Sequence, residues 1–254
     1  MNLRYIDLSV DYSSYDDVFF NIFTDNVFFV SHFLSRRIRA FKIPTDGSFN
    51  MLSVCLTKSG DSCQIVSEKC LITKMNFSEE NLKSYLNMHD EKQRFEHYLS
   101  LLEKGYNLAS KFKAIPIDIL LNLHTEFRNN NYKNEWLFKK KTVKEYGLKI
   151  VLKHVLTSYD YKLMLSLYDT KNQFVNDGCI YQTFPDSILF DKNVRHLVIE
   201  YGKLIITDFL DHPQFVCELS DLSKGIIKSE CVDENTRKYI PNEENREKFE
   251  RLKW

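Results

Sequence analysis

The order of apolar and polar residues along the chain predicts helices mainly in the first half and strands mainly in the second. Between residues 90 and 112, apolar residues recur every third or fourth position, which is the spacing of one helix face. This stripe consists of Phe95, Tyr98, Leu99, Leu102, Tyr106, Ala109 and Phe112. This segment is one of four predicted helices, over 26–41, 78–89, 90–112 and 116–128. Pro116 lies in the first turn of the last one.

Alternation of apolar and polar residues predicts the strands. It is complete between Leu148 and Thr157, where every second residue shares one face. We predict strands over 3–10, 49–58, 69–75, 135–141, 148–157, 161–167, 173–184, 195–200, 203–209 and 215–219. Because most connections between them are short, we expect antiparallel pairing, with a hairpin at Tyr201-Gly202.

These elements together predict an α+β fold. We expect a mostly antiparallel sheet with helices packed on one face, the helices concentrated in the first half and a β-meander in the second. We expect a single domain over 1–228, and the alternative is two sub-lobes over 1–128 and 132–228. Residues 229–254 are expected to form a charged C-terminal tail with a short helix.

Composition indicates a chain that can fold on its own core. Of its 254 residues 43% are hydrophobic and 14% aromatic, which excludes wholesale disorder. Lys and Arg together equal Asp and Glu at 35 each, whereas proteins that depend on phosphate contacts usually carry a basic excess. Ala occurs only at Ala40, Ala109 and Ala114, while Lys and Asn abound, which indicates an AT-rich genome. The large number of lysines therefore carries less information about function than it first suggests.

The chain shows no targeting signal that we can identify. Residues 1–7 lack the apolar core of a signal peptide, and wholly apolar stretches such as 27–30 are too short to span a membrane. The six cysteines form no C-x-x-C pair and fit no zinc or haem spacing. We therefore expect a cytoplasmic protein with reduced thiols and no membrane partner.

No catalytic or cofactor motif stands out. His124-Thr125-Glu126 has the H-x-E form of zinc deaminases, but that metal site also needs a P-C-x-x-C segment, which the chain lacks. We therefore expect His124 near the apolar face of a helix, and His154 as a hydrogen-bonded core residue on a strand. With 7 Gly and no phosphate-binding loop or G-x-S-x-G elbow, we expect no enzyme activity, no cofactor and no metal. An enzyme whose site assembles only in three dimensions is the alternative.

The first thirty residues combine acidic and aromatic side chains. This stretch contains five Asp, and Arg4 is its only Lys or Arg. Tyr offers rigid contact area, and carboxylates steer and pair with Lys or Arg, so the cluster suits contact with a basic cleft. We consider Asp11, Tyr12, Tyr15, Asp16, Asp17 and Asp25 as partner-binding residues. The alternative, compatible with the first, is that Ser13, Ser14, Asp16 and Asp17 start a helix.

The segment from residue 128 to 153 is basic. Its cations, opposed by Glu135 and Glu145, are Arg128, Lys133, Lys139, Lys140, Lys141, Lys144, Lys149 and Lys153. Tyr132, Trp136 and Phe138 stand among them, a combination that can follow a nucleic-acid backbone and stack bases. The alternative, which we favour, is the solvated face of strands whose Lys stems cover apolar surface. Such a surface could also bind an acidic protein.

The run Asp11-Tyr12-Ser13-Ser14-Tyr15-Asp16-Asp17-Val18-Phe19-Phe20, in a neutral α+β chain without catalytic motifs, resembles the immunity proteins that bacteria make beside polymorphic or contact-delivered toxins. Such proteins share no common motif, so the resemblance assigns no residue a role. It implies a cognate protein toxin as partner, blocked by a stoichiometric complex. A nucleic-acid-binding accessory protein that uses the basic segment is the alternative function.

Overall fold

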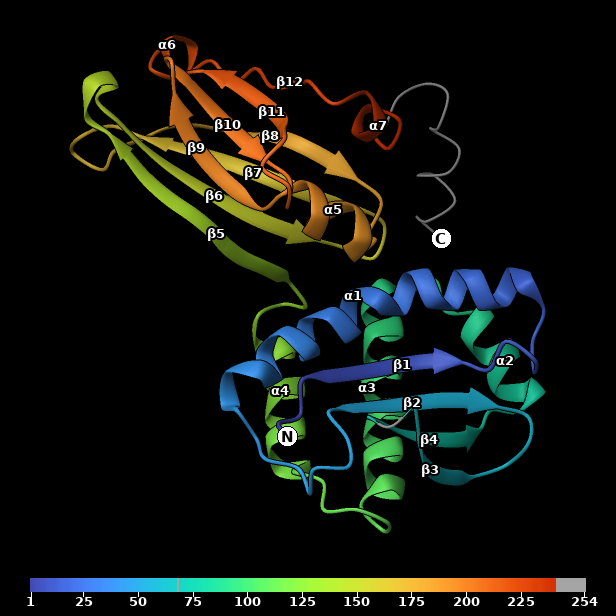
Figure 1. Ribbon diagram of the computed structural model, residues 1–254. Coiled ribbons are helices and arrows are strands. Elements are labelled where there is room, and N and C mark those ends of the chain that lie inside the picture. The colour runs from blue at the N-terminus through green and yellow to red at the C-terminus, as the bar shows by residue number, and fades with distance from the viewer. Residues whose placement is uncertain (68, 241–254) are drawn as a thin grey trace. The chain divides into compact units, whose positions relative to one another are not determined.

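The computed structural model describes residues 1–67 and 69–240, which form two compact units. Unit 1 is Met1–Lys133, and unit 2 begins at Asn134 (Figure 1). The predicted mixture of helices and strands is confirmed, with most helices in the first half and a β-meander in the second. The sequence predicts one domain over 1–228, or sub-lobes over 1–128 and 132–228; the two units divide the chain between Lys133 and Asn134. The helix expected after Pro241 lies outside the described residues.

Unit 1 combines a four-stranded sheet with four helices. Its elements are β1 (Tyr5–Val10), α1 (Asp17–Phe41), β2 (Met51–Thr57), β3 (Ser62–Val66), β4 (Cys70–Asn76), α2 (Glu79–Leu86), α3 (Glu91–Ala109) and α4 (Ile117–Asn129). The strand order is β1-β2-β4-β3, and β1, β2 and β4 are parallel, with only β3 antiparallel. The antiparallel pairing that we expected is therefore wrong for this sheet. Strand β3, which we did not predict, returns the chain so that β2 and β4 run the same way.

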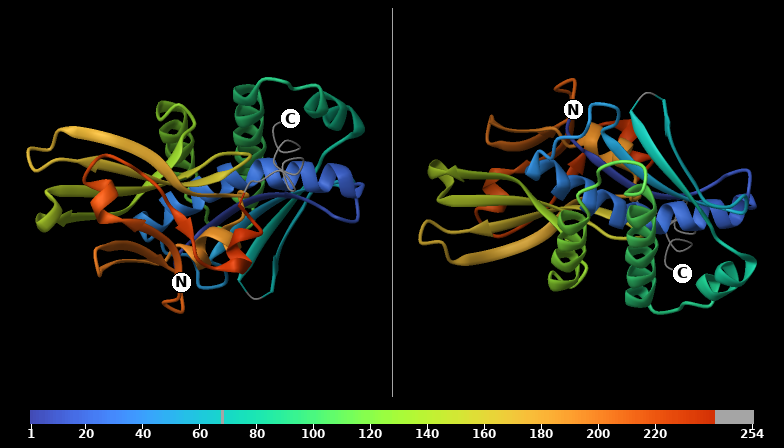
Figure 2. Two further views of the ribbon diagram at one scale, coloured as in Figure 1. Left: turned by 90° about the horizontal axis from the view of Figure 1, so that it is seen from above. Right: turned by 90° about the horizontal axis from the view of Figure 1, so that it is seen from below.

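The core of unit 1 lies between one face of this sheet and the helices. Ile6, Leu8 and Val54 alternate with more polar residues along their strands and are almost fully buried. Helix α3 comes so close that a Cβ atom at Gly105 would lie 2.3 Å from Cγ2 of Val54. Helices α3 and α4 lie side by side (Figure 2). Aromatic rings join them to α1, with Phe33 and Phe127 at 4.7 Å between centroids.

Helix α1 also closes the outer edge of β1. The backbone N–H of Ile6 donates to Oγ of Ser35 at 2.9 Å, and that hydroxyl donates to the Ile6 carbonyl at 2.9 Å. The N–H of Leu8 donates to Oγ of Ser31 at 3.2 Å. Both serines are buried, so α1 supplies the hydrogen bonds that a further strand would otherwise make.

By length and composition alone, α1 could cross a membrane, which our reading of short apolar runs did not anticipate. Within unit 1, however, 56% of its most apolar stretch is buried. Phe23, Val30 and Leu34 are buried in the core, and the serine contacts hold the helix against β1. The apolar character of α1 is thus accounted for by packing inside unit 1.

Unit 2 is built mainly from two antiparallel sheets, drawn as two layers in Figure 1. Its elements are β5 (Asn134–Val143), β6 (Leu148–Leu156), β7 (Tyr161–Tyr168), β8 (Phe174–Thr183), α5 (Ser187–Asn193), β9 (His196–Glu200), β10 (Lys203–Thr207), β11 (Pro213–Glu218), α6 (Leu219–Leu222), β12 (Glu230–Cys231) and α7 (Glu234–Arg237), with a 3-10 turn at Lys144–Tyr146. The sheets have the orders β5-β6-β7-β8 and β12-β11-β10-β9.

Large apolar side chains fill the space between these layers. The rings of Tyr181 on β8 and Phe215 on β11 stack at 4.4 Å and join the two sheets. Phe190 of α5 stacks on Tyr161 at 4.3 Å. The face of β6 that carries Leu148 and Ile150 is buried as the alternation predicts, whereas Lys149 and Lys153 on the other face are less buried; Val151 on that face departs from the pattern and is buried. Helix α5 was not predicted.

Candidate functional site

Polar side chains meet where the parallel strands of unit 1 end. Asp11 directly follows β1, Thr57 is the last residue of β2, and Lys74 lies near the end of β4. Because the three strands are parallel, their carboxyl ends share one edge of the sheet, which is where open α/β sheets commonly bind ligands. This edge is therefore the first place to look for a site.

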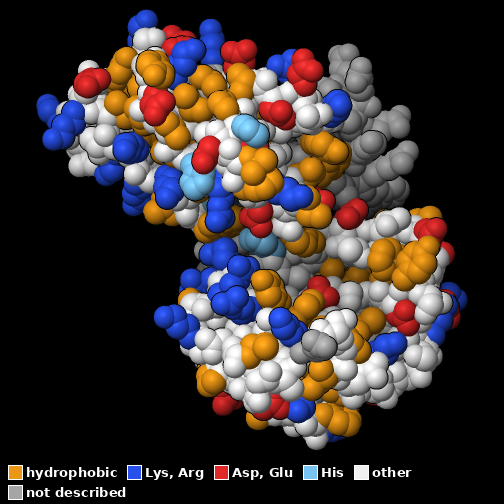
Figure 3. Space-filling model, in the orientation of Figure 1, with side chains coloured by type: hydrophobic (Ala, Val, Ile, Leu, Met, Phe, Trp, Pro, Cys, Tyr) orange, Lys and Arg blue, Asp and Glu red, His pale blue; other side chains and the backbone are white. Residues whose placement is uncertain are grey.

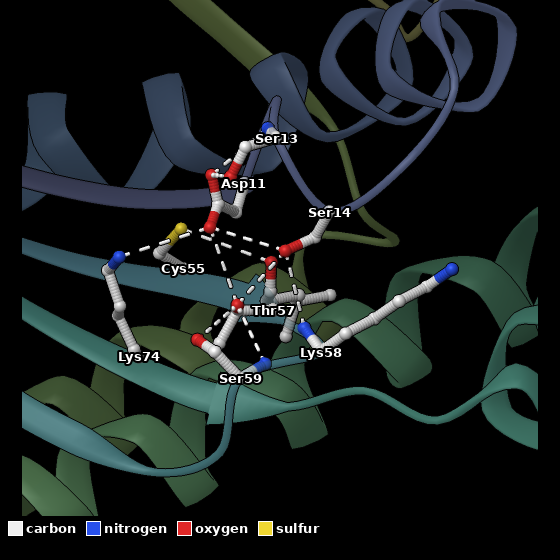
Figure 4. A network of polar contacts seen from close by, with 9 residues as sticks. Asp11, Ser13, Ser14, Cys55, Thr57, Lys58, Ser59 and Lys74 are labelled. Carbon is white, nitrogen blue, oxygen red and sulfur yellow. Dashed lines mark hydrogen bonds and ion pairs between the residues drawn. The ribbon is translucent and has the colours of Figure 1, made fainter.

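Asp11 is the centre of this cluster (Figure 4). Its Oδ1 accepts hydrogen bonds from the backbone N–H of Ser13 at 3.2 Å and from the Ser13 hydroxyl at 3.0 Å. Its Oδ2 accepts from Ser14 at 3.3 Å and from Thr57 at 3.4 Å. Lys74 Nζ lies 3.9 Å from the same oxygen. We call Asp11, Ser13, Ser14, Thr57, Ser59 and Lys74 the Asp11 network; Ser59 joins it through Thr57 at 2.9 Å.

The charges around Asp11 and the burial of Cys55 set which of these groups are ionised. Partial burial would raise the pKa of Asp11, but the hydrogen bonds from Ser13 and the charge of Lys74 lower it on balance. Asp11 is therefore ionised near neutral pH. Burial raises the pKa of the neighbouring Cys55 thiol, which keeps it protonated and a poor nucleophile. The hydrogen bonds of the network hold the loop between β1 and α1 in place.

The remaining acidic residues lie on the outer side of the same loop and helix. Asp16 is the N-cap of α1 and accepts from the backbone N–H of Phe19 at 2.9 Å. Asp17 follows in the first turn, and Asp25, eight positions later, lies about two turns along on the same side. Tyr12 is 65% exposed and its ring meets that of Phe20 edge-on at 5.3 Å. We call Tyr12, Asp16, Asp17, Val18 and Asp25 the acidic surface.

Two residues that we had considered for partner binding point inward. Asp11 serves the network described above, and Tyr15 is buried, with its hydroxyl donating to the Phe77 carbonyl at 2.9 Å. Burial, with nearby Glu79, raises the pKa of Tyr15 to about 12. Val18, which is 68% exposed, was not identified from the sequence. Its position beside two Asp was visible, but nothing in the sequence showed that it points outward.

The basic segment is divided between the two units. In unit 1, Arg128 makes a two-pronged contact with Glu96, through Nε at 2.8 Å and Nη2 at 2.9 Å. The Tyr132 hydroxyl donates to the same carboxylate at 2.6 Å. This contact lowers the pKa of Glu96. Arg128 is thus engaged inside unit 1, where Lys133 is the last residue.

In unit 2, the lysines follow β5, an edge strand of its sheet. Lys139, Lys140 and Lys141 are exposed, as is Lys144 after the strand ends. Figure 3 shows Lys and Arg side chains gathered along this side of unit 2. The aromatic residue Trp136 stacks on His154 at 4.6 Å and so packs within unit 2.

Buried histidines occur in both units. His124 in α4 is almost fully buried, and its Nε2 lies 3.4 Å from the Tyr106 hydroxyl. Burial, followed by the charge of Arg128, lowers the pKa of His124 to about 4. His154 contacts the Tyr161 hydroxyl through Nδ1 at 2.7 Å. Both occupy the core positions that we expected. Within residues 1–67 and 69–240, no three His, Cys, Asp or Glu side chains are grouped so as to hold a metal ion.

Comparison of the chain with protein-family models, with curated proteins and with solved structures finds no match. Its function must therefore be inferred from its own residues. The acidic surface of unit 1 and the lysines along β5 are exposed, charged surfaces within the part of the chain that the structure describes.

Proposed function

We propose that the chain is an inhibitory binding protein of the immunity type, which neutralises a cognate bacterial toxin by forming a stoichiometric complex. Its contact with the toxin is the acidic surface of unit 1. The observation that carries the proposal is the exposure of Tyr12 and Val18 beside Asp16 and Asp17, on a loop and helix start that the Asp11 network holds in place.

The physical argument rests on what such a surface offers a basic cleft. Tyr12 and Val18 present apolar area that becomes buried on contact. Asp16, Asp17 and Asp25 supply negative charge that accelerates association with a cationic partner. Because the loop is already fixed by hydrogen bonds, little conformational entropy is lost on binding.

The proposal includes a cytoplasmic location. The six cysteines, which include Cys55 and Cys217 in the core, are all unpaired. A reducing compartment keeps such thiols free, and a toxin that acts in the cytoplasm would be met there.

The test uses the full chain and the toxic product of an adjacent gene. Co-expression should restore growth, and the purified proteins should form a one-to-one complex. In the variant Asp16→Asn/Asp17→Asn, Asn still caps the helix, so the fold is kept while two charges are removed. We expect association to slow about threefold to tenfold at low salt, with the difference shrinking as salt rises.

A matched control is available on α3, which also begins with an acidic cap. Asp90 is its N-cap and Glu91 lies in its first turn. The variant Asp90→Asn/Glu91→Gln removes the same charge from the same kind of position and should leave association unchanged. Equal association rates for both double variants would eliminate the acidic surface as the contact. Failure to rescue growth or to form a complex would refute the inhibitor function.

A second candidate function is nucleic-acid binding by unit 2. The observation in its favour is the run of exposed lysines Lys139, Lys140 and Lys141, for which no ion pair is found among the described residues. The inward packing of Trp136 removes one base-stacking platform. A gel-shift titration with single-stranded RNA and duplex DNA at low salt decides the matter: no retardation excludes this function.

A further inference from the structure

Unit 1 contains a groove that neither candidate function uses. It runs along α3 beside the end of β4 and has a volume of about 420 Å³. Its floor is apolar, formed by Met75, Phe77 and Leu101, all of which are largely buried. Such a floor suits the hydrocarbon or aromatic part of a small molecule.

His97 provides a buried polar atom in this groove. Its Nε2 is buried and has no hydrogen-bond partner among the described residues, and its ring lies 6.2 Å from that of Phe77. Burial, followed by the charge of Lys104, lowers the pKa of His97. A buried ring nitrogen without a partner costs free energy, which a bound ligand would recover once the neighbouring side chains move enough to uncover Nε2.

Two lysines give the groove its charge. Lys104 lies on α3 and Lys111 in the turn that follows the end of this helix at Ala109, and both line the groove. Neither makes an ion pair within the described residues. The only carboxylate in the lining is that of Asp61, whose Oδ1 already accepts the backbone N–H of Asn76 at 2.9 Å. The balance of charge in the groove is therefore positive.

Amide side chains complete the polar rim. Asn76, Asn81 and Asn107 come from the end of β4, the first turns of α2 and the body of α3, respectively. Each can donate two hydrogen bonds and accept others without adding charge. The groove thus combines an apolar floor, two cations, neutral donors and one unpartnered ring nitrogen.

We propose that this groove binds a phosphate monoester of a small organic molecule, with the phosphate between Lys104, Lys111 and His97 and the organic part on the Met75–Phe77–Leu101 floor. Phosphate can bond to Nε2 of His97 whether or not that nitrogen carries the proton. The phosphate oxygens accept a hydrogen bond from a protonated nitrogen, and a monoprotonated phosphate donates one to an unprotonated nitrogen. Two lysines match its double charge better than the single charge of a carboxylate. The site is separate from the acidic surface, so it stands or falls independently of the inhibitor function.

The test is a calorimetric titration of the full chain with phenyl phosphate, accompanied by NMR of the histidine ring nitrogens. We expect millimolar or tighter binding and a selective shift of the His97 signals. Lys104→Ala/Lys111→Ala should weaken binding at least tenfold, whereas Lys83→Ala/Lys92→Ala, two lysines of α2 and α3 outside the lining, should not. His97→Phe should weaken binding, and His97→Gln should restore part of it by offering a polar atom.

Melting temperatures of the variants show whether each one is folded. Absence of phenyl phosphate binding to the wild-type chain overturns the proposal, as does equal binding by the Lys104→Ala/Lys111→Ala variant. Benzoate carries the same ring with a carboxylate; binding of benzoate as tight as that of phenyl phosphate would overturn the assignment to phosphate. Inorganic phosphate should bind more weakly than phenyl phosphate, because it leaves the apolar floor uncovered.

Discussion

The two units of the chain stabilise their sheets in different ways. In unit 1, helix α1 closes the edge of β1 through Ser31 and Ser35, and α3 lies so close to β2 that only glycine fits at position 105. In unit 2, strands joined largely by hairpins form two layers around apolar side chains, and the edge strand β5 carries exposed lysines. Both units bury a large apolar core, and unit 1 adds close or hydrogen-bonded contacts at Gly105, Ser31 and Ser35.

This difference has an energetic consequence. A buried polar group that loses its partner costs its full desolvation free energy, and a close helix–sheet contact cannot absorb an added methyl group. Loss of one apolar contact among many costs less when neighbours can shift. Single substitutions at these contacts of unit 1 should therefore be more damaging than matched substitutions in unit 2.

The largest difference is expected between two glycines. A Cβ at Gly105 would lie 2.3 and 2.6 Å from the two γ-methyl carbons of Val54, whereas one at Gly178 in β8 would lie 3.2 Å from Ile227. Gly105→Ala should lower the free energy of unfolding of unit 1 by about 3 kcal/mol. Gly178→Ala should cost unit 2 less than about 1 kcal/mol, because the Ile227 side chain can move. Urea unfolding, monitored by hydrogen exchange of the backbone amides in each unit, measures both losses of stability.

The cause can be checked by giving the methyl group room. Val54→Ala in the Gly105→Ala background should recover part of the lost stability, although Val54→Ala alone is destabilising. If the two substitutions are additive, the Gly105–Val54 contact is not the cause. Equal losses in Gly105→Ala and Gly178→Ala would contradict the contrast between the units.

The next effect concerns acid sensitivity, through His124. Its folded pKa of about 4 lies below its ordinary value of 6.5, because burial and Arg128 disfavour the charged ring. As pH falls below 6.5, the imidazole of His124 becomes protonated in the unfolded chain but stays neutral in the folded chain. The free energy of unfolding therefore decreases between pH 6.5 and 4, by about 3 kcal/mol. Above pH 6.5 this contribution is constant. Urea unfolding of unit 1 as a function of pH measures it.

Other groups titrate in the same range, so the comparison needs a variant. The pKa of Glu96 is lowered by Arg128 and that of Asp7 is raised by burial, and both contribute to the pH profile. His124→Leu removes only the imidazole from the balance and fills similar space. The free energy of unfolding of the His124→Leu variant, relative to that of the wild-type chain, should increase as pH falls from 6.5 to 4. Parallel profiles would mean that His124 is readily protonated in the folded chain.

Much of this fold could be predicted from the pattern of residues. Helix α3 and strands β5 to β11 of unit 2 lie within a few residues of their predicted limits, because most of them have a regular apolar face, whereas the short strand β12 was not predicted. Strand β3 was missed, since Ser62–Val66 is short and largely exposed. That omission also decided the pairing: without β3, β2 and β4 are consecutive strands with a short connection, for which antiparallel pairing is the rule.

The candidate site was less predictable. Residues that cap a helix and residues that contact a partner have the same composition, so the sequence could not separate Asp16, which caps α1 from the surface, from Asp11, which turns inward. Besides the serines of its own loop, the partners of Asp11 come from two other strands, Thr57 from β2 and Lys74 from β4. Such a cluster becomes visible only once the strands are known to be parallel.

The smallest effect that we predict compares the two protected sheet edges. Ser35→Ala removes the acceptor for the Ile6 N–H and the donor to the Ile6 carbonyl, both buried in unit 1. We expect a loss of about 1–2 kcal/mol in the free energy of unfolding, with faster hydrogen exchange at Ile6. Ser100→Ala, at an exposed position of α3, is the control and should change stability by less than about 0.5 kcal/mol.

The matching change in unit 2 should act on association instead of stability. Lysines on an edge strand discourage pairing with another chain, so Lys139→Thr/Lys141→Thr should leave the free energy of unfolding within about 0.5 kcal/mol and increase self-association, measured by sedimentation. The lysines on the edge strand β5 are exposed, whereas at the edge of β1 the serines of α1 bind the backbone of Ile6 and Leu8. A stability loss in the lysine variant as large as that of Ser35→Ala would show that β5 is held by its side chains, and the contrast between the two edges would fail.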